Sequence, residues 1–167
     1  PLHDDRALFE FLVLESAQAG LSWQTILSKR GRYRSVFDNF NPGEIADYTD
    51  KKIQSLMNDP GIIRNRLKIS SAVTNARAFI GVADSFGSFD QYLWRFVDGS
   101  PVMNSRENPE DVPAYTPLSK ALSRDLRQHG FTFIGPTICY SFMQAVGMVN
   151  DHLTGCFRYQ ELSRNTR

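Results

Sequence analysis

Three features of the sequence predict an all-α fold. Helix-start signals follow one another along the chain, glycines stand where helices should end, and strand signals are few. The 167 residues are 41% hydrophobic and 22% charged, a composition that suits a globular protein with a substantial core. We therefore expect a single domain over residues 1–167, built as a helical bundle with two lobes.

Capping residues place the helices of the first half of the chain. Asp4 and Asp5 begin a helix that ends at Gly20, where a left-handed residue is favoured. Ser22 caps the next helix through its side-chain oxygen. Further helices are predicted to start at Asn41-Pro42 and at Thr49-Asp50, to run over 62–83, and to start at Ser88 with Gln91.

The second half begins with a stretch rich in Pro, Asn, Ser and Gly. This stretch, residues 98–113, is interpreted as an exposed loop between the two lobes. Thr116-Pro117 then begins a helix that Gly130 ends. Gly135-Pro136 begins another, which is predicted to continue through Val146.

Charge and cysteine content narrow the possible functions. The chain carries 19 Lys and Arg against 18 Asp and Glu, so its net charge of +1 provides no global attraction to nucleic acid. Cys139 and Cys156 are too few for a disulfide framework, which favours a cytoplasmic location. No stretch has the length of a membrane span, so we expect no membrane partner.

The glycine-bounded turn before Pro136 indicates a phosphate-binding corner. A helix that starts at Gly135 directs unpaired N–H groups and its positive dipole end outward, and Thr137 lies in its first turn. Such a corner binds a phosphate without reading sequence. Glycine-bounded corners are also common packing geometry, so the hairpin alone does not establish DNA binding.

A basic face precedes this turn. Lys120, Arg124 and Arg127 are spaced by four and three residues, so they share one side of the predicted helix and could contact phosphates. On the pattern alone, the better interpretation is a set of solvated charges on an amphipathic helix.

Two longer strings carry a resemblance to a known family. They are LESAQAGLSW at 14–23 and TICYSFMQA at 137–145, the latter continuing to VNDH at 149–152; GIIRNR at 61–66 and NARA at 75–78 add to them. Together they resemble the DNA-3-methyladenine glycosylase I family of the helix-hairpin-helix DNA glycosylase superfamily. The similarity covers almost the whole chain, although the usual hydrophobic-x-Gly-x-Gly turn appears here as Phe133-Ile134-Gly135-Pro136, with one glycine replaced.

The resemblance implies a helix-hairpin-helix glycosylase-like bundle and a base excision repair enzyme. Such an enzyme hydrolyses the N-glycosidic bond and releases 3-methyladenine from alkylated duplex DNA after flipping the base. A methylated adenine is cationic and departs as a neutral base, so no strong general acid is required. We expect a monofunctional glycosylase without lyase activity, in which Asp151 is structural.

Glu15 and Trp23 match the family's base-binding glutamate and stacking tryptophan, and Glu15 is the candidate catalytic residue. A carboxylate accepts hydrogen bonds from the exocyclic amine and attracts a cationic base, whereas an indole face favours an electron-poor ring. Leu21, at the tip of the turn between them, could fill the gap left by the flipped nucleotide. Without the resemblance, a solvated glutamate and a core tryptophan would be the better interpretations.

His152 and Cys156 are a candidate half of a structural zinc site. Four residues apart on a helix, they would face the same side, but structural zinc normally takes four ligands. The resemblance implies a Cys and a His upstream of the position where this chain begins, together with aromatic residues of the base pocket. His3 is not at the matching place, so the chain as it stands is expected to bind zinc weakly or not at all.

Two other functions remain open on the sequence. The chain could be a non-catalytic helix-hairpin-helix module that contacts the DNA backbone, or a helical scaffold for protein partners. The first would be favoured if Glu15 and Trp23 did not share a cavity. A monomer acting on double-stranded DNA with alkylated adenine is the default expectation for a small repair protein.

Overall fold

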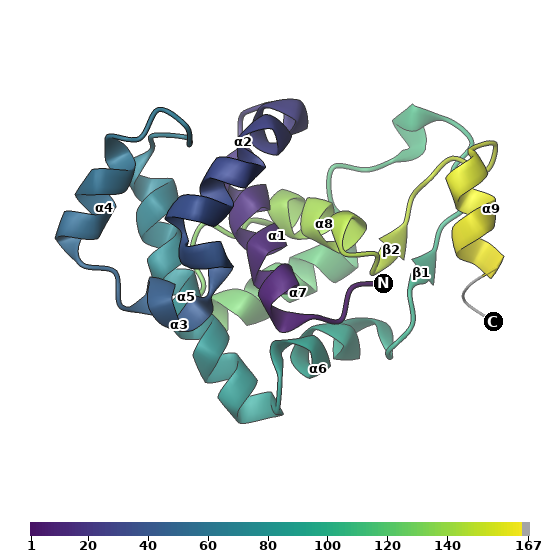
Figure 1. Cartoon of the computed structure of the whole chain (residues 1–167). Coiled ribbons are helices and arrows are strands. Elements are labelled where there is room, and N and C mark those ends of the chain that lie inside the picture. Colours follow the sequence, from purple (N-terminus) through teal and green to yellow (C-terminus); the bar gives the residue numbers. More distant parts are fainter. Residues whose placement is uncertain (165–167) are drawn as a thin grey trace.

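The computed structural model describes residues 1–164 and confirms the all-α fold class (Figure 1). Helix α1 (Asp5–Gln18) lies at the centre, and α2 (Trp23–Val36) follows it after a short turn. The other helices are α3 (Pro42–Ala46), α4 (Asp50–Met57), α5 (Arg66–Phe86), α6 (Phe89–Trp94), α7 (Pro117–Gln128), α8 (Pro136–Ala145) and α9 (Phe157–Arg164).

The predicted caps are confirmed at the helix starts. Asp4 accepts a hydrogen bond from the N–H of Ala7 at 2.8 Å, and Ser22 accepts one from Thr25 at 3.2 Å. Equivalent side-chain caps come from Asn41, Thr49, Ser88 and Thr116. Gly20 and Gly130 follow α1 and α7 with φ of +81° and +90°, a conformation that glycine adopts without steric cost.

Helix α1 forms the middle of the hydrophobic core. Leu8, Phe9, Leu12 and Leu14 are fully buried, and α1 contacts α2, α5, α6 and α8. The Phe9 ring meets Phe79 of α5 edge-on, with ring centroids 5.1 Å apart. Burying one such side chain stabilises the fold by about 2 kcal/mol, so α1 holds the surrounding helices in fixed positions.

Helix α5 starts later than predicted, at Arg66 rather than Ile62, and it ends at Phe86. The reason is local: Asn65 caps the helix by accepting from the N–H of Lys68 at 3.1 Å. The side chain of Ile62, which the helical pattern included, is instead buried in the preceding segment.

The loop predicted over 98–113 contains a short strand. Strand β1 (Val102–Met103) pairs in parallel with β2 (Val149–Asn150), with Val102 opposite Val149 and Met103 opposite Asn150. The bonds from the N–H of Val102 to Met148 and of Asn104 to Asn150 measure 2.8 and 3.1 Å. This ladder connects the loop to the residues that follow α8. The division of the domain into two lobes stays a prediction.

None of the helices within residues 1–164 has the length and apolar content needed to cross a membrane. The last residues of the predicted domain, 165–167, lie outside the described part of the chain.

Candidate functional site

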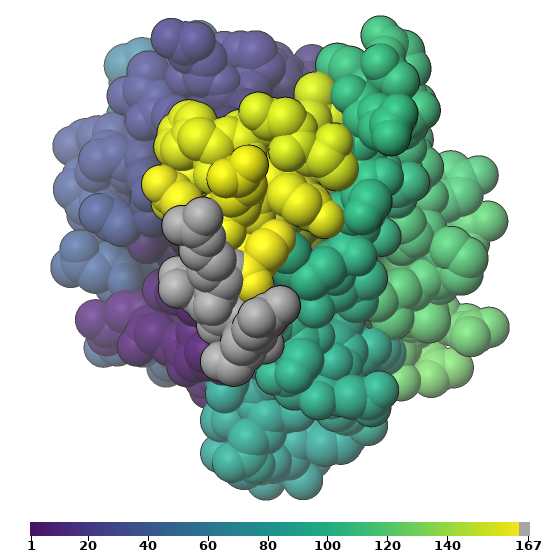
Figure 2. All heavy atoms as spheres, turned by 90° about the vertical axis from the view of Figure 1, so that its right-hand side faces the viewer, coloured from purple at the N-terminus to yellow at the C-terminus, as the bar shows by residue number. Residues whose placement is uncertain are grey.

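A cavity of about 510 Å³ lies where α1, α2 and α8 face the β1–β2 ladder. Its walls include Glu15 and Gln18 of α1, Trp23 of α2, Gln144 of α8 and Met103 of β1. Leu162 of α9 also lines it. Figure 2 shows α9 crossing the middle of one face of the molecule, between the α1–α2 side and the segment around 98–113.

Glu15 is a buried carboxylate, with 5% of its surface exposed. Burial raises the pKa of Glu15 to about 7 because the charged form loses its hydration. Within residues 1–164 no hydrogen bond or ion pair compensates for this loss. The cavity therefore contains a carboxylate that a cationic or hydrogen-bond-donating ligand would stabilise.

Trp23 reaches the same cavity from the first turn of α2. Glu15 lies one turn before the end of α1, and the short connection to α2 returns the chain directly to the cavity. The structure therefore brings Glu15 and Trp23 together, as the base-pocket hypothesis requires. The opposite arrangement, which would have favoured a non-catalytic module, is not observed.

The α1–α2 turn (residues 19–22) is held from both sides. The Nζ of Lys68, on α5, donates to the carbonyls of Ala17 and Ala19 at 2.8 and 2.7 Å, and so caps the end of α1. Gln18 Nε2 donates to the carbonyl of Leu21 at 2.6 Å. The Leu21 side chain is 37% exposed at the tip of this turn, so an apolar group projects from a fixed backbone.

The hairpin turn (residues 129–135) between α7 and α8 is also anchored to neighbouring helices. The side chain of Asn75 on α5 accepts from the N–H of Thr132 at 2.8 Å and donates to its carbonyl at 3.1 Å. Ser123 Oγ donates to the carbonyl of Ile134 at 2.7 Å. Gly135 begins α8 without a side-chain cap, and Thr137 is exposed in its first turn, as the phosphate-binding interpretation requires.

The predicted basic face is exposed on α7. Lys120, Arg124 and Arg127 point away from the buried Leu122 and Leu126. The Lys120 ammonium lies 4.4 Å from the ring centroid of Tyr115, a cation–π contact that leaves its charge available to solvent. These three side chains form no ion pair within the described residues, so they can face an anionic partner.

Residues 1–159 match the model of the methyladenine glycosylase family. The chain belongs to this family. It is 43% identical over 159 residues to DNA-3-methyladenine glycosylase 1 of Escherichia coli, covering 95% of this chain and 85% of the relative. It is 44% identical over 156 residues to DNA-3-methyladenine glycosylase of Haemophilus influenzae, covering 93% and 84%.

Solved structures of the family show the same fold. A crystal structure of 3-methyladenine DNA glycosylase I superposes with a TM-score of 0.91 at 47% identity, covering 94% of this chain and 86% of that one. The enzyme from Staphylococcus aureus, solved to explain 3-methyladenine recognition, gives a TM-score of 0.91 at 39% identity, with coverage of 94% and 84%.

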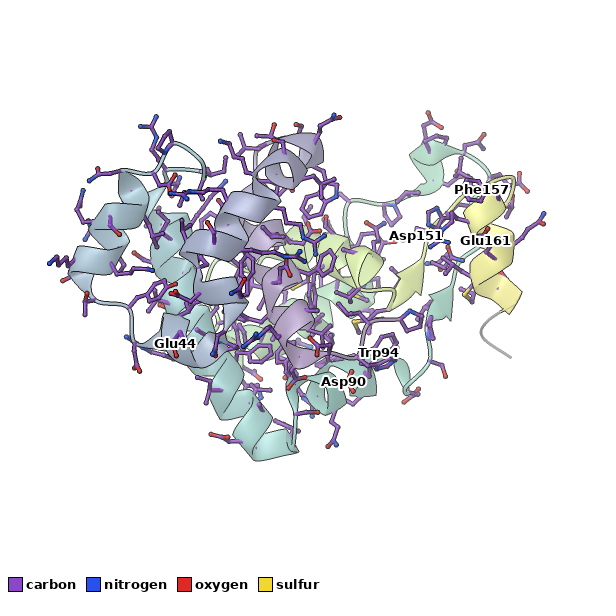
Figure 3. All side chains as sticks on the ribbon, viewed as in Figure 1. Glu44, Asp90, Trp94, Asp151, Phe157 and Glu161 are labelled. Carbon is purple, nitrogen blue, oxygen red and sulfur yellow. The ribbon has the colours of Figure 1, made fainter. Side chains whose placement is uncertain are left out.

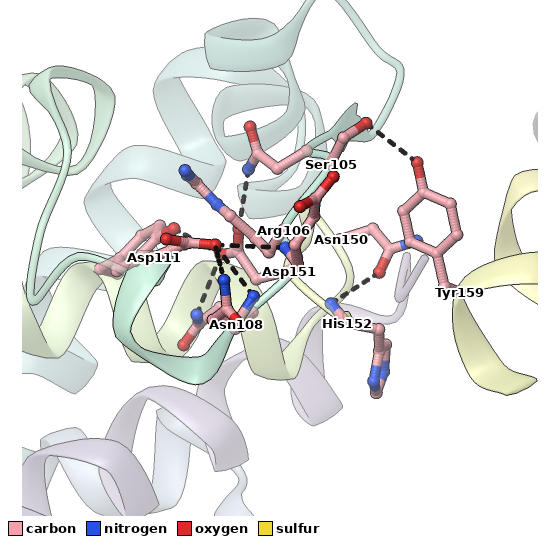
Figure 4. Close-up of polar contacts among 12 residues, drawn as sticks. Ser105, Arg106, Asn108, Asp111, Asn150, Asp151, His152 and Tyr159 are labelled. Carbon is pink, nitrogen blue, oxygen red and sulfur yellow. Dashed lines mark hydrogen bonds and ion pairs between the residues drawn. The ribbon is translucent and has the colours of Figure 1, made fainter. Parts of the chain in front are cut away.

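Asp151 belongs to the supporting framework of this methyladenine glycosylase fold. Its carboxylate accepts hydrogen bonds from Tyr140, from Gln144 at 3.0 Å and from Asn104 at 2.9 Å, and pairs with Arg106 at 3.4 Å (Figure 4). Burial alone would raise the pKa of Asp151, but these hydrogen bonds outweigh it and lower the pKa. The carboxylate thus ties the 98–113 segment to α8 and β2, which supports its predicted structural role.

Asn150 is a cavity residue to which the sequence assigned no role. Its side chain is 4% exposed, and its Oδ1 accepts from the N–H of His152 at 3.1 Å (Figure 4). The Nδ2 is buried with no hydrogen-bond partner among residues 1–164. Gln144 of α8 and Met103 were missed as lining residues too; Met103 reaches the cavity through the β1–β2 ladder, which no sequence pattern indicated.

The candidate zinc pair differs from expectation in its local structure. His152 and Cys156 lie in the turn before α9, not on a helix, because α9 begins only at Phe157. The distance from Cys156 Sγ to His152 Nδ1 is 3.9 Å, close to the ~3.6 Å expected for two ligands of one tetrahedral zinc ion. Residues 1–164 contain no group of three or more potential ligands, so the pair fits half a site.

Proposed function

We propose that this chain is a monofunctional DNA-3-methyladenine glycosylase that acts in base excision repair. The observation that carries the proposal is the uncompensated Glu15 carboxylate in the same cavity as the Trp23 indole. A carboxylate without a partner is costly in a fold unless a ligand supplies the missing contact. A flipped, cationic purine supplies both a positive charge and an exocyclic amine.

Binding divides between the two side chains. Glu15 accepts a hydrogen bond from the exocyclic amine of 3-methyladenine and attracts its positive charge. The face of Trp23 stacks on the same ring, which an indole favours for a cation. Because adenine without the methyl group is neutral, this pair discriminates in favour of the damaged base.

Bond cleavage needs little further assistance. Water attacks the C1′ carbon of the sugar, the bond from C1′ to N9 breaks, and its electron pair neutralises the positive ring. The water proton passes to solvent, leaving free 3-methyladenine and an abasic site.

DNA is held by the elements around the cavity. The N–H groups of α8 at Gly135 and Thr137 bind phosphates of the damaged strand, with Lys120 and Arg124 adding charge. Leu21 occupies the space that the flipped nucleotide leaves. We propose that the chain acts as a monomer on double-stranded DNA.

His152 and Cys156 are proposed as two ligands of a structural zinc ion, which would fix the turn before α9 beside the cavity. Zinc content measured by atomic absorption on the wild type and on a Cys156→Ser variant tests this role. In the intact protein, with the upstream Cys and His that the resemblance implies, one equivalent in the wild type and none in the variant is the expected result; equal zinc in both rejects the role.

The test of the enzyme is release of base from methylated duplex DNA, identified by chromatography. We expect wild type to release 3-methyladenine, and Glu15→Gln to release it at least about a hundredfold more slowly because about 3 kcal/mol of charge stabilisation is lost. Glu44→Gln is the matched control, since Glu44 lies on α3, across the molecule from Asp151 at the cavity (Figure 3). No release by wild type rejects the enzyme, and equal release by Glu15→Gln rejects only the role of Glu15.

A further inference from the structure

The segment that joins α4 to α5 is irregular but firmly held. The N–H of Gly61 donates to Asp59 at 2.7 Å, and the N–H of Ile63 donates to the hydroxyl of Tyr33 at 3.1 Å. Lys29 Nζ donates to the carbonyl of Pro60 at 2.9 Å. The backbone that leads into α5 therefore has fixed contacts to α2 along its length.

This segment presents positive charge that the fold does not neutralise. Arg64 and Arg66 are exposed and form no ion pair or hydrogen bond within the described residues. Between residues 59 and 68 the only acid is Asp59, and it already pairs with Arg32 at 2.7 Å. We call residues 64–68 the basic edge.

The first turn of α5 is unusual in its charge. It contains no acidic residue, and Arg66 and Lys68 stand where the helix dipole disfavours cations. Leu67 beside them is 70% exposed. Cations and a solvent-exposed leucine in the first turn of a helix are unfavourable for the isolated protein. Both would be stabilised by an anionic partner that also has apolar surface, such as the sugars of DNA.

The position of the basic edge follows from two contacts of α5. Asn75 binds the hairpin turn through Thr132, and Lys68 binds the carbonyls at the end of α1, next to the α1–α2 turn. Seven residues separate Lys68 from Asn75, which is about 10 Å along a helix. Along α5 the order is therefore the contact to the hairpin turn, the contact to the end of α1, and the basic edge, so Arg64 and Arg66 lie beyond the α1 contact, at the end of this row away from the hairpin.

We propose that Arg64 and Arg66 bind phosphates of the undamaged DNA strand. The inference rests on the proposed function, in which the hairpin turn holds the damaged strand and Leu21 fills the gap in the stack. A minor groove about 6 Å wide separates the two backbones, and an arginine side chain reaches a similar distance. The duplex is then held on both sides of Leu21, which keeps it open while the base occupies the cavity.

The experiment measures binding of an Arg64→Gln/Arg66→Gln double variant to DNA that carries one stable abasic-site analogue. In duplex form, we expect affinity to fall roughly tenfold, and the slope of log Kd against log salt to decrease by about 2, one phosphate per arginine. Affinity for the damaged strand alone should match wild type. Arg6→Gln is the control, because Arg6 is exposed and unpaired at the opposite end of α1 from the turn.

The outcomes separate this inference from the proposed function. An unchanged salt slope, or an equal loss with single-stranded and duplex DNA, overturns the assignment of the arginines to the undamaged strand. If the double variant unfolds at the same temperature as the wild type, misfolding is excluded as the cause of a loss of DNA affinity. The DNA contains no methylated base, so the binding result stands whether or not the wild type releases 3-methyladenine, which is the separate test of the enzyme.

Discussion

Helix α1 carries two buried glutamates in opposite electrostatic environments. Glu10 is 6% exposed and Glu15 is 5% exposed. Glu10 accepts hydrogen bonds from Arg30 at 2.7 Å and from Arg34 at 2.8 and 3.1 Å. Burial alone would raise the pKa of Glu10, but the two arginines outweigh it and lower the pKa; Glu15 has no such partner, and its pKa rises to about 7.

The difference between them separates a carboxylate that the fold neutralises from one that it leaves uncompensated. Glu10 connects α1 to α2, and the contact is complete within the protein. Glu15 is also desolvated, five residues later, yet its surroundings leave that cost uncompensated in the free protein. A buried carboxylate without compensation is a candidate functional group, and the following experiments test whether Glu10 and Glu15 differ in this way.

The largest effect is expected for the stability of Glu15→Gln. The folded-state pKa of about 7 lies above the ordinary glutamate pKa of 4.5, so the folded wild type loses stability as pH rises between these values. At pH 8 the variant should therefore be more stable by about 3 kcal/mol, and the gain should vanish near pH 4.5. Urea unfolding at several pH values measures this, and a loss of stability at pH 8 would contradict an uncompensated charge.

Glu10→Gln should behave in the opposite way. Removing this carboxylate leaves Arg30 and Arg34 without their partner, and we expect a loss of about 2 kcal/mol at neutral pH. The folded-state pKa of Glu10 is lowered, so this stabilisation is present above the ordinary glutamate pKa of 4.5 and disappears as pH falls through the folded pKa. Base release per folded molecule should be unchanged, and a selective loss of release would mean that Glu10 has a functional role.

The pH dependence of base release provides a third comparison. Glu15 must be ionised to stabilise a cationic base, so single-turnover release should fall about tenfold per unit below pH 7 and level off above it. Glu15→Gln should show a flat profile over the same range after spontaneous loss of base is subtracted. A wild-type pH profile without this inflection would mean that ionisation of Glu15 does not control base release.

The smallest effect is expected at the support of the α1–α2 turn. Lys68→Met removes the donors to the carbonyls of Ala17 and Ala19, which should cost about 1 kcal/mol and reduce release from duplex DNA about fivefold. Binding of free 3-methyladenine, followed by Trp23 fluorescence, should not change. Lys51→Met on the exposed face of α4 is the control, and an equal loss in both variants would exclude a role of the turn.

Local signals predicted most of the helical framework. Asp4, Ser22 and Thr116 each have side chains that bind the first turn of a helix, so their positions in the sequence identified the starts correctly. The start of α5 was wrong because apolar periodicity at Ile62 favoured a helix, whereas Asn65 determines the actual cap. Periodicity reports burial, and a buried residue need not be helical.

The cavity was only partly predictable. The resemblance identified Glu15 and Trp23, which adjacent segments of one helical hairpin bring together. Asn150 and Met103 reach the cavity through a two-residue parallel pairing, too short to produce any alternation of side chains. The basic edge also escaped notice, because the sequence drew attention to Lys120 and Arg124 at helical spacing. A role for Arg64 and Arg66 can be inferred only from the contacts that place α5 beside the α1–α2 turn.

The β1–β2 ladder has a consequence for how specificity can change in this fold. Its bonds run between main-chain groups, so they persist when the side chains of Met103 or Val149, which line the cavity, are replaced. One wall of the cavity can thus be re-lined while the helix that presents the carboxylate stays where it is. Libraries at these few positions are a direct route to enzymes that accept bulkier alkylated purines.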